Sequence, residues 1–337
     1  MKKFIGVDLH KKTIVICVVS KDRQVLESRR FYCAETQRIH EWFAAQGPFE
    51  VVVEATASYE WFVQLVEPHA GRVVLAHPGK LRIIAQSTRK SDKLDARTLA
   101  EFLALGMIPE AYRPTPRQRE HRRLVRHRHY LRGRITSIKN RLRNILADYN
   151  ADRPNLFAQG GSEYMRGLAL LGADRFVLEG LLKELSLYYE RIHAVEKELQ
   201  EFAKTAPPTE AAARKLLATI PGVGTVTTEV FLSEIADLQR FSSQKKVVAY
   251  AGLAPGQRES AGRRRELGIS HAGSGILRWV LNQASWQLVR RSAHWQRIFE
   301  AIAKRRGKKK AITAISRRLL CVMTSIVNSG EAYRPAA

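Results

Sequence analysis

Four acidic residues lie where carboxylates could bind a divalent cation. Asp8 lies in the apolar run FIGVDL, and Glu54 ends the apolar run VVVE. Asp92 and Asp95 are three residues apart in KSDKLDARTLAEFL, where a helix would place both carboxylates on one face. A carboxylate in an apolar strand is costly unless it is paired or bound to a cation. The pattern favours a site of oxygen ligands for Mg²⁺, which assists phosphoryl transfer in many proteins.

Each acid also has a structural explanation. A single acid in a strand is most often a rim residue or a satisfied polar group. Asp92 and Asp95 would suit the first turn of a helix that has Ser91 as its N-cap. Taken alone, each acid favours the structural explanation, whereas the four together favour a metal site.

A serine among arginines is the second candidate for chemistry. Ser260 is expected in a loop rich in Gly and Arg, where guanidinium groups would hold a phosphate and stabilise charge on its oxygens. These guanidinium groups belong to Arg258, Arg263, Arg264 and Arg265. By spacing alone, a loop serine is usually a solvent-facing turn residue. Ser270, expected as a helix N-cap, and Ser274 are local alternatives.

A glycine turn is the third feature that points to phosphate. IPGVGTVTTEV (220–230) places Gly222 and Gly224 between two expected helices. This is the pattern of a helix-hairpin-helix, in which backbone N–H groups hold a phosphate without reading sequence. An ordinary glycine turn is the alternative.

The composition indicates that the binding partner is a polyanion. The chain has 337 residues, 57 Lys plus Arg against 32 Asp plus Glu, a net charge of +25 and a pI near 10.4. Such an excess of positive charge is typical of proteins that bind nucleic acid. Three cysteines without metal spacing argue against zinc and a disulfide framework. With no signal-peptide pattern and no apolar run near the ~20 residues of a membrane span, we expect a cytoplasmic protein without a membrane partner.

The first third of the chain predicts the fold that would position the acids. Three short strands are expected at 4–9, 13–20 and 24–32, followed by a helix at 35–46. A strand at 49–56, a helix at 58–70 and a strand at 71–78 complete the pattern. This order predicts a ribonuclease-H-like α/β domain.

The rest of the chain predicts helices. Residues 113–143 hold twelve Lys or Arg and one acid on an amphipathic helix, and a second helix at 173–204 would return along it after a polar loop at 150–163. A linker at 203–212 leads to a mostly helical region at 213–325. Phosphate contacts are expected from Arg122, Arg123, Arg126, Arg132, Arg134, Lys139, Arg141, Lys308 and Lys309, with His121, His127 and His129 as phosphate neighbours. Helical spacing predicts core positions for Trp279, Trp286, Trp295 and Phe299.

Five motifs together resemble one known family over residues 4–325. The first four are GVDLHKKT, VVVEAT, KSDKLDARTLAEFL and IPGVGTVTTEVFLSEI. The fifth is a series in which AYAGLAP is followed by the later serine, then by GISHAGS and then by LR. In order and spacing they resemble the DEDD transposases of the IS110 insertion-sequence family and its IS1111 subgroup, also called bridge-RNA-guided recombinases. The chain departs from the family pattern at His271, where members often have Lys or Arg.

The resemblance implies a detailed mechanism. It implies a RuvC-like domain at 1–112 whose Asp8, Glu54, Asp92 and Asp95 bind Mg²⁺. It implies a basic helical coiled coil at 113–204 that helps to assemble homodimers into a tetramer. A serine transposase domain at 205–327, with the helix-hairpin-helix, would follow, and then a tail at 328–337. Ser260 would attack DNA to form a covalent phosphoserine link, and a structured non-coding (bridge) RNA would pair with donor and target DNA.

We therefore expect a Mg²⁺-dependent, RNA-guided DNA recombinase. One alternative is a RuvC-like, structure-specific endonuclease in which the carboxylates activate water and Ser260 only contacts phosphate. A second alternative is a non-catalytic nucleic-acid chaperone whose acids are structural.

Overall fold

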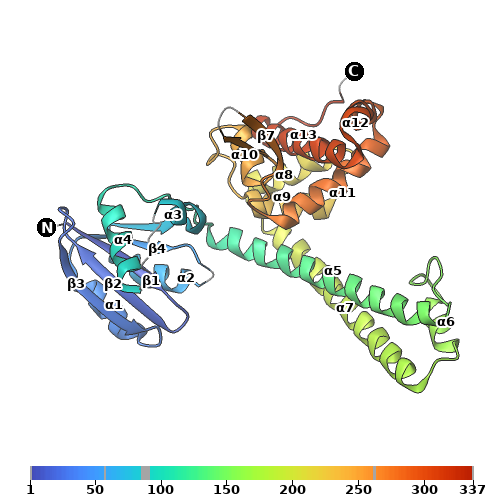
Figure 1. Ribbon diagram of the computed structural model, residues 1–337, viewed down its shortest axis with the longest axis horizontal. Helices are drawn as coiled ribbons and strands as arrows, with labels where there is room; N and C mark the ends of the chain where they lie inside the picture. The colour runs from blue at the N-terminus through green and yellow to red at the C-terminus, as the bar shows by residue number, and fades with distance from the viewer. Residues whose placement is uncertain (1, 57, 85–91, 261–262, 336–337) are drawn as a thin grey trace. The chain divides into compact units, whose positions relative to one another are not determined.

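The computed structural model describes residues 2–56, 58–84, 92–260 and 263–335, with backbone alone at 82–84, 92–94, 257–260 and 263–266. The chain forms two compact units, Met1–Arg113 (unit 1) and Pro114–Ala337 (unit 2). Figure 1 labels most of their elements. The finer division into domains at 112, 204 and 327 stays an expectation from the sequence.

Unit 1 contains a five-stranded mixed sheet, in agreement with the expected ribonuclease-H-like α/β domain. Its strands are β1 (Lys3–Leu9), β2 (Thr13–Val19), β3 (Val25–Tyr32), β4 (Phe49–Glu54) and β5 (Arg72–Ala76). Their order is β3-β2-β1-β4-β5; the first three form an antiparallel meander, while β1–β4 and β4–β5 are parallel pairs. β1, β2 and β4 are almost continuously buried, as strands covered on both faces are.

Helices cover both faces of this sheet. On one face α1 (Thr36–Ala44) and α2 (Glu60–Val66) bury Ile39, Phe43 and Phe62 against the alternate side chains of β1 that include Ile5 and Val7. On the other face lies α4 (Asp92–Ala104), whose buried residues include Ala96, Leu99 and Ala100. The short helix α3 (Pro78–Ile84) follows β5.

Gly6 is the position that allows α4 to approach the sheet so closely. A Cβ built there would lie 2.0 Å from the carbonyl oxygen of Ala96 and 2.4 Å from the backbone nitrogen of Ala100. Real Cβ atoms do not make such contacts, so only glycine permits this distance between strand and helix. Because Asp8 is two residues farther along β1, its side chain points to the same face as Gly6.

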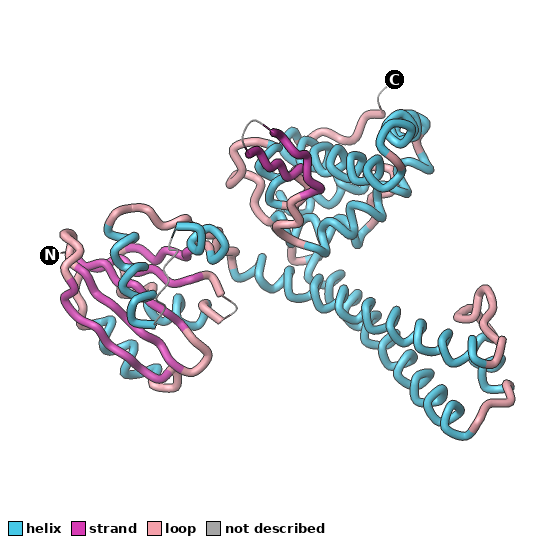
Figure 2. Tube along the Cα trace, viewed as in Figure 1, coloured by secondary structure: helices cyan, strands magenta, loops and turns pink. Residues whose placement is uncertain are grey.

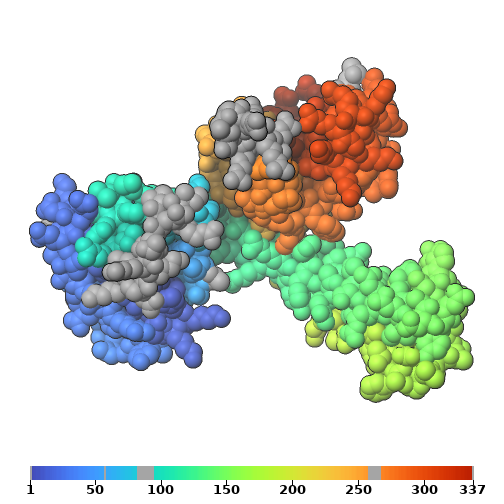
Figure 3. Space-filling view, in the orientation of Figure 1, coloured from blue at the N-terminus to red at the C-terminus, as the bar shows by residue number. Residues whose placement is uncertain are grey.

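Unit 2 begins with two long helices that pack along each other, as the apolar spacing predicts. They are α5 (Pro116–Asp148) and α7 (Gly172–Lys204), with the short helix α6 (Gly161–Gly167) between them. Leu131, Ile138 and Leu142 of α5 share one apolar cluster with Leu178 and Leu185 of α7. In Figures 2 and 3 this helical pair projects from the rest of unit 2.

A capping box fixes the start of α5. The Thr115 side chain accepts a hydrogen bond from the Gln118 backbone N–H, and the Gln118 side chain accepts one from the Thr115 backbone N–H. These contacts satisfy two N–H groups that a helix start leaves without partners. The basic helix therefore begins at Pro116, three residues after Arg113 where the expected basic stretch began.

The remainder of unit 2 is mostly helical, as expected. Its helices are α8 (Pro208–Ala218), α9 (Thr225–Ile235), α10 (Gln244–Tyr250), α11 (Gly275–Arg291), α12 (Ala293–Arg306) and α13 (Lys308–Ser329). The loop expected around Ser260 is wrong, because the backbone there forms an antiparallel pair of strands, β6 (Pro255–Ser260) and β7 (Arg263–Ile269).

Two observations concern the C-terminal end. Among the described helices, α13 is long and apolar enough to cross a membrane by length and composition, but Ile315, Leu319 and Met323 place its apolar side in the core of unit 2. α13 is therefore a core helix of this unit. Beyond α13, Tyr333 accepts a hydrogen bond from the Trp295 indole N–H at 2.9 Å, so the expected tail is anchored at this residue.

Candidate functional site

Two of the four predicted acids lie side by side in the sheet. β1 and β4 run parallel, and Val7 pairs with Val53. The next residues, Asp8 and Glu54, therefore occupy matching positions on adjacent strands, and their side chains point to one face. Both are partly buried, and Asp8 retains 16% exposure of its side chain.

The third and fourth acids belong to the helix that covers this face. Asp95 precedes Ala96, whose carbonyl oxygen contacts Gly6 on the Asp8 side of β1. Its side chain is exposed, and so it does not contribute to the apolar contact of α4 with the sheet. Asp92 is the first residue of α4, with only its backbone described. Ser91, the alternative N-cap, lies outside the described residues.

The donor chemistry of this face fits a hard divalent cation. Asp8 and Glu54 supply carboxylate oxygens on neighbouring strands, and oxygen ligands are those that Mg²⁺ and similar ions prefer. Asp8 also contacts His10, with 3.1 Å between Oδ2 and Nε2. Among the side chains that the structure describes, which exclude that of Asp92, no three His, Cys, Asp or Glu groups lie close enough to hold a metal ion.

The predicted nucleophile lies at the end of a strand. Ser260 is the last residue of β6 and pairs with Arg263, the first residue of β7. Arg258 pairs with Arg265 in the same ladder. The backbone therefore brings arginines close to the serine, although only the backbone of these residues is described.

The structure distinguishes the two alternative serines. Ser274 is the N-cap of α11, and its Oγ accepts a hydrogen bond from the Leu277 backbone N–H at 3.2 Å. The expectation that Ser270 is a helix N-cap is therefore wrong, because the helix begins only at Gly275. Ser274 already has a structural role in starting this helix.

The predicted glycine turn joins α8 to α9. Gly222 has φ +83°, and a Cβ there would lie 2.8 Å from the Leu288 backbone nitrogen, so the position requires glycine. Gly224 is the N-cap of α9 and is exposed, without a side chain to bond the first N–H groups of the helix. These groups are therefore not satisfied by their own cap residue.

The basic residues of α5 divide into two sets. Arg126 makes two hydrogen bonds to the Glu234 carboxylate, at 2.8 and 3.0 Å, and Arg122 donates to the Ser233 carbonyl oxygen. These two cations therefore neutralise or cap groups of unit 2 itself. The other predicted contacts are exposed or half-buried: Arg123, Arg132, Arg134, Lys139 and Arg141 of α5, with Lys308 and Lys309 of α13.

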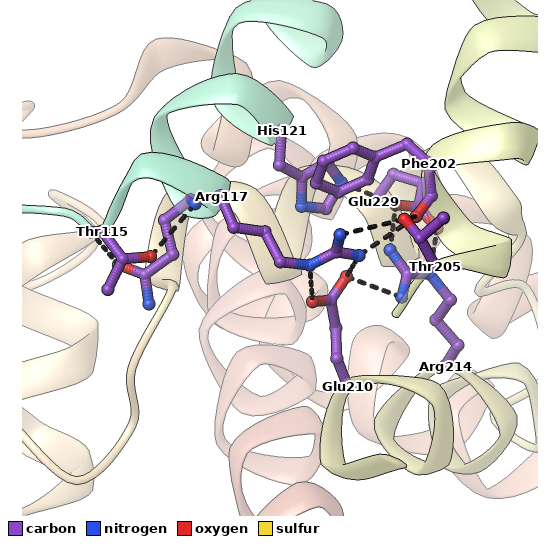
Figure 4. A network of polar contacts seen from close by, with 9 residues as sticks. Thr115, Arg117, His121, Phe202, Thr205, Glu210, Arg214 and Glu229 are labelled. Atoms are coloured by element: carbon purple, nitrogen blue, oxygen red, sulfur yellow. Dashed lines mark hydrogen bonds and ion pairs between the residues drawn. The ribbon is translucent and has the colours of Figure 1, made fainter. Parts of the chain in front are cut away.

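Sequence reasoning missed a buried polar network where α5 meets α8 and α9 (Figure 4). His121 is only 4% exposed, stacks on Phe202 and lies 2.6 Å from Oε2 of Glu229 through its Nε2. Its expected role as a phosphate neighbour is wrong, because it faces the interior. Arg214 donates to both oxygens of Glu229, at 2.7 and 2.9 Å.

Charge in this network is balanced by a second carboxylate. Glu210 accepts hydrogen bonds from Arg117 and forms an ion pair with Arg214 at 2.8 Å. Burial alone would raise the pKa of Glu229, but the hydrogen bonds from His121 and Arg214 outweigh burial and lower the pKa below its ordinary 4.5. The pKa of Glu210 is lowered in the same way by Arg117 and Arg214. Only the period of α5 could have indicated that His121 turns inward, since it shares a face with Val125.

Comparison with known proteins assigns this architecture to a family. Residues 5–151 match the DEDD transposase model of the IS110 group, and residues 214–300 match the model described as transposase of the IS116/IS110/IS902 family. The transposase for insertion sequence element IS1111A of Coxiella burnetii is 26% identical, covering 99% of this chain and 92% of that protein. The transposase for IS1328 of Yersinia enterocolitica is 26% identical over 83% and 82% of the two chains, and the pilin gene-inverting protein of Moraxella bovis is 22% identical over 98% of each. Because the two models together span more than half of the chain, the protein belongs to the IS110 family of DNA transposases.

Proposed function

We propose that this transposase cuts and rejoins DNA under the guidance of a structured non-coding (bridge) RNA. The observation that carries the chemical part is that Asp8 and Glu54 directly follow the paired residues Val7 and Val53 of β1 and β4, on the face covered by the helix that begins at Asp92. The resemblance of the motifs to bridge-RNA-guided recombinases supports the RNA partner. Base pairing would select the sequences, while the protein holds backbone and shape.

The acidic face has the role of placing a DNA phosphate. Asp8, Glu54, Asp92 and Asp95 would hold Mg²⁺, which when bound offsets negative charge on phosphate oxygens. The two strand acids are fixed by the ladder, whereas the two helix acids depend on the packing of α4 at Gly6. A defect in that packing would therefore misplace half of the ligand set.

Ser260 supplies the nucleophile in this proposal. Its Oγ attacks the phosphorus, its proton is lost, and the P–O bond to one side of the DNA strand breaks to release a hydroxyl end. Attack by a hydroxyl end of the partner strand then reverses the step and frees the serine, so no oxidant or external energy source is needed. Arg258, Arg263, Arg264 and Arg265 would stabilise charge on the phosphate oxygens.

Other parts of unit 2 would hold the nucleic acids and assemble the complex. The exposed cations of α5 and α13 would contact RNA and DNA phosphates, and the turn at Gly222 and Gly224 would act as a helix-hairpin-helix. We propose that the α5–α7 pair functions as the coiled coil through which homodimers form a tetramer.

The test is recombination between matched donor and target plasmids with the RNA supplied. We expect Asp8→Asn and Ser260→Ala to abolish product, whereas Ser270→Ala, a serine just beyond β7, retains it. Denaturing gels of wild-type reactions should show a protein–DNA adduct that Ser260→Ala lacks. Normal product from Ser260→Ala would refute the nucleophile assignment.

The same assay distinguishes the proposed recombinase from a nuclease that hydrolyses DNA. If the carboxylates activate water, Ser260→Ala still cuts DNA and no adduct forms, while Asp8→Asn is inactive. If recombination proceeds without added or co-purified RNA, the guidance part of the proposal fails and the metal site stands.

A further inference from the structure

A cavity of about 540 Å³ lies in unit 2. It is formed where the base of α5 and α7 meets α9 and α11, and Val125, Leu199 and Val223 contribute to its largely apolar wall. Cavities of about 300–1,000 Å³ with apolar walls and a few polar groups are typical of sites for small organic groups. None of the described lining residues is one of the four acids or Ser260.

An exposed tryptophan lies at this cavity. Trp279 lines it and is 40% exposed, so the core position that helical spacing predicted for this residue is wrong. The ring of His129 lies 5.2 Å from the Trp279 ring, centroid to centroid, at an interplanar angle of 61°. Burial, together with the neighbouring Arg128, lowers the pKa of His129, which favours its neutral form. Two aromatic rings therefore lie together at the wall.

The charged side chains of the cavity are already paired with one another or with neighbouring groups. Arg128 donates from Nε to Oε1 of Glu196 at 2.9 Å, and Arg214 donates to Glu229. The polar groups left at the surface are neutral: the amide of Gln200 and the hydroxyl of Thr225 are both in exposed residues of the lining. An amide both donates and accepts hydrogen bonds. The cavity thus suits a flat, neutral heterocycle with a polar edge.

We propose that the cavity receives one unpaired nucleobase of the DNA substrate, which stacks on Trp279 and directs its polar edge to Gln200 and Thr225. The assignment rests on the proposed function, since strands that are opened and rejoined carry unpaired bases. Exposed Arg132 lies one turn beyond Arg128 on α5, where it would contact the phosphate that flanks such a base. Stacking on an aromatic ring accepts any base, so the site would recognise an unpaired base without reading its identity.

The experiment compares two DNA hairpins that differ by a single-nucleotide bulge, bound to the full-length protein and followed by fluorescence anisotropy. We expect the wild type to bind the bulged hairpin more tightly than the fully paired one. Trp279→Ala should weaken binding of the bulged hairpin by about 5- to 150-fold and leave the paired hairpin unchanged. Trp279→Phe should keep most of the preference, because it retains an aromatic face.

Two further variants make the result specific. Tyr130→Ala removes an aromatic residue of α5 that is 56% exposed and does not line the cavity, and it should preserve the preference. Ala203→Leu adds volume within the lining and should weaken binding of the bulged hairpin while Trp279 remains in place. This second variant tests the cavity even if Trp279→Ala lowers the melting temperature.

The remaining outcomes refute the nucleobase site, its assignment to DNA, or the proposed function. Equal affinity of the wild type for both hairpins, or an unchanged preference in Trp279→Ala and Ala203→Leu, refutes the nucleobase site and leaves the proposed function standing. A preference seen with RNA hairpins of the same sequence but not with DNA overturns the assignment to DNA. Failure to bind any of the hairpins contradicts the proposed function as well as the cavity assignment.

Discussion

Replacing Glu229 by glutamine tests whether the buried polar network stabilises unit 2. The Glu229 side chain is 7% exposed and has three close contacts: His121 at 2.6 Å, and Arg214 at 2.7 and 2.9 Å. Glutamine has nearly the same shape but no charge, so Arg214 would keep only Glu210 as its ionic partner. The change therefore removes charge from the network without creating a cavity.

The expected magnitude follows from the burial of the pair. Breaking a buried ion pair by removing one partner costs about 3–5 kcal/mol of the free energy of unfolding. Because Glu210 still compensates Arg214, we expect the lower limit, about 3 kcal/mol. For a unit of this size each kcal/mol lowers the melting temperature by about 2–4 °C, which gives a decrease of about 6–12 °C.

Calorimetry of the full-length chain measures this decrease, and we expect the transition of unit 1 to stay in place. Glu179→Gln is the matched control, because it breaks an ion pair with Arg166 in the same unit at 3.3 Å with 49% and 34% exposure of the two side chains. Surface pairs contribute about 0–1 kcal/mol, so this variant should lower the melting temperature by no more than about 4 °C.

A decrease for Glu229→Gln no larger than that for Glu179→Gln would refute the argument from burial. A double-mutant cycle with Arg214→Met provides a second check. The two changes together should destabilise unit 2 by less than the sum of the single changes, because each single change already removes the ion pair between Arg214 and Glu229.

Three further predictions concern pH, packing and salt. Because folding lowers the pKa of Glu229, the contribution of this residue to stability is complete above pH 4.5 and is lost as the pH falls through the lower folded value. The melting temperature of unit 2 should therefore decrease in that acidic range. The decrease should be less steep in Glu229→Gln. Gly6→Ala should lower the melting temperature of unit 1 and abolish recombination, because α4 must move away from the acids. Gly133→Ala is the control, since a Cβ at this position of α5 meets open space, and it should raise the free energy of unfolding by about 0.5–1 kcal/mol. Replacing Lys308 and Lys309 by glutamine should reduce the slope of log affinity against log salt for duplex DNA by about 1.8, and an unchanged slope would exclude them as phosphate contacts.

The sequence predicted the fold of unit 1 because its signals are local. Short β-branched runs such as residues 13–20 are buried on both faces, and so they read as strands without knowledge of their neighbours. The same applies to the apolar period of α5 and α7, which predicts that the two helices pack together. The sequence placed Asp8 and Glu54 on strands of one expected sheet, and the parallel register of β1 and β4 was decided by the tertiary structure.

Other residues were assigned wrongly because their surroundings come from distant segments. β6 and β7 contain many Gly and Arg residues, which locally favour a loop, but pairing of the two strands overrides that preference. Trp279 fits the period of a buried helical face, yet the cavity beside α9 leaves it exposed. Period alone indicates which side of a helix a residue occupies and gives no information about what lies there.

The amino-acid sequence by itself determined the charge of the protein, the types of its main elements and the acids that could bind metal. Tertiary structure decided which polar groups face inward. His121 and Glu229 are 108 positions apart in the sequence, and so are Arg126 and Glu234. No local pattern therefore shows that His121 and Arg126 of α5 bind carboxylates inside unit 2. The physical reason is that a buried charge is tolerated only with a partner, and the fold alone brings that partner within hydrogen-bonding distance.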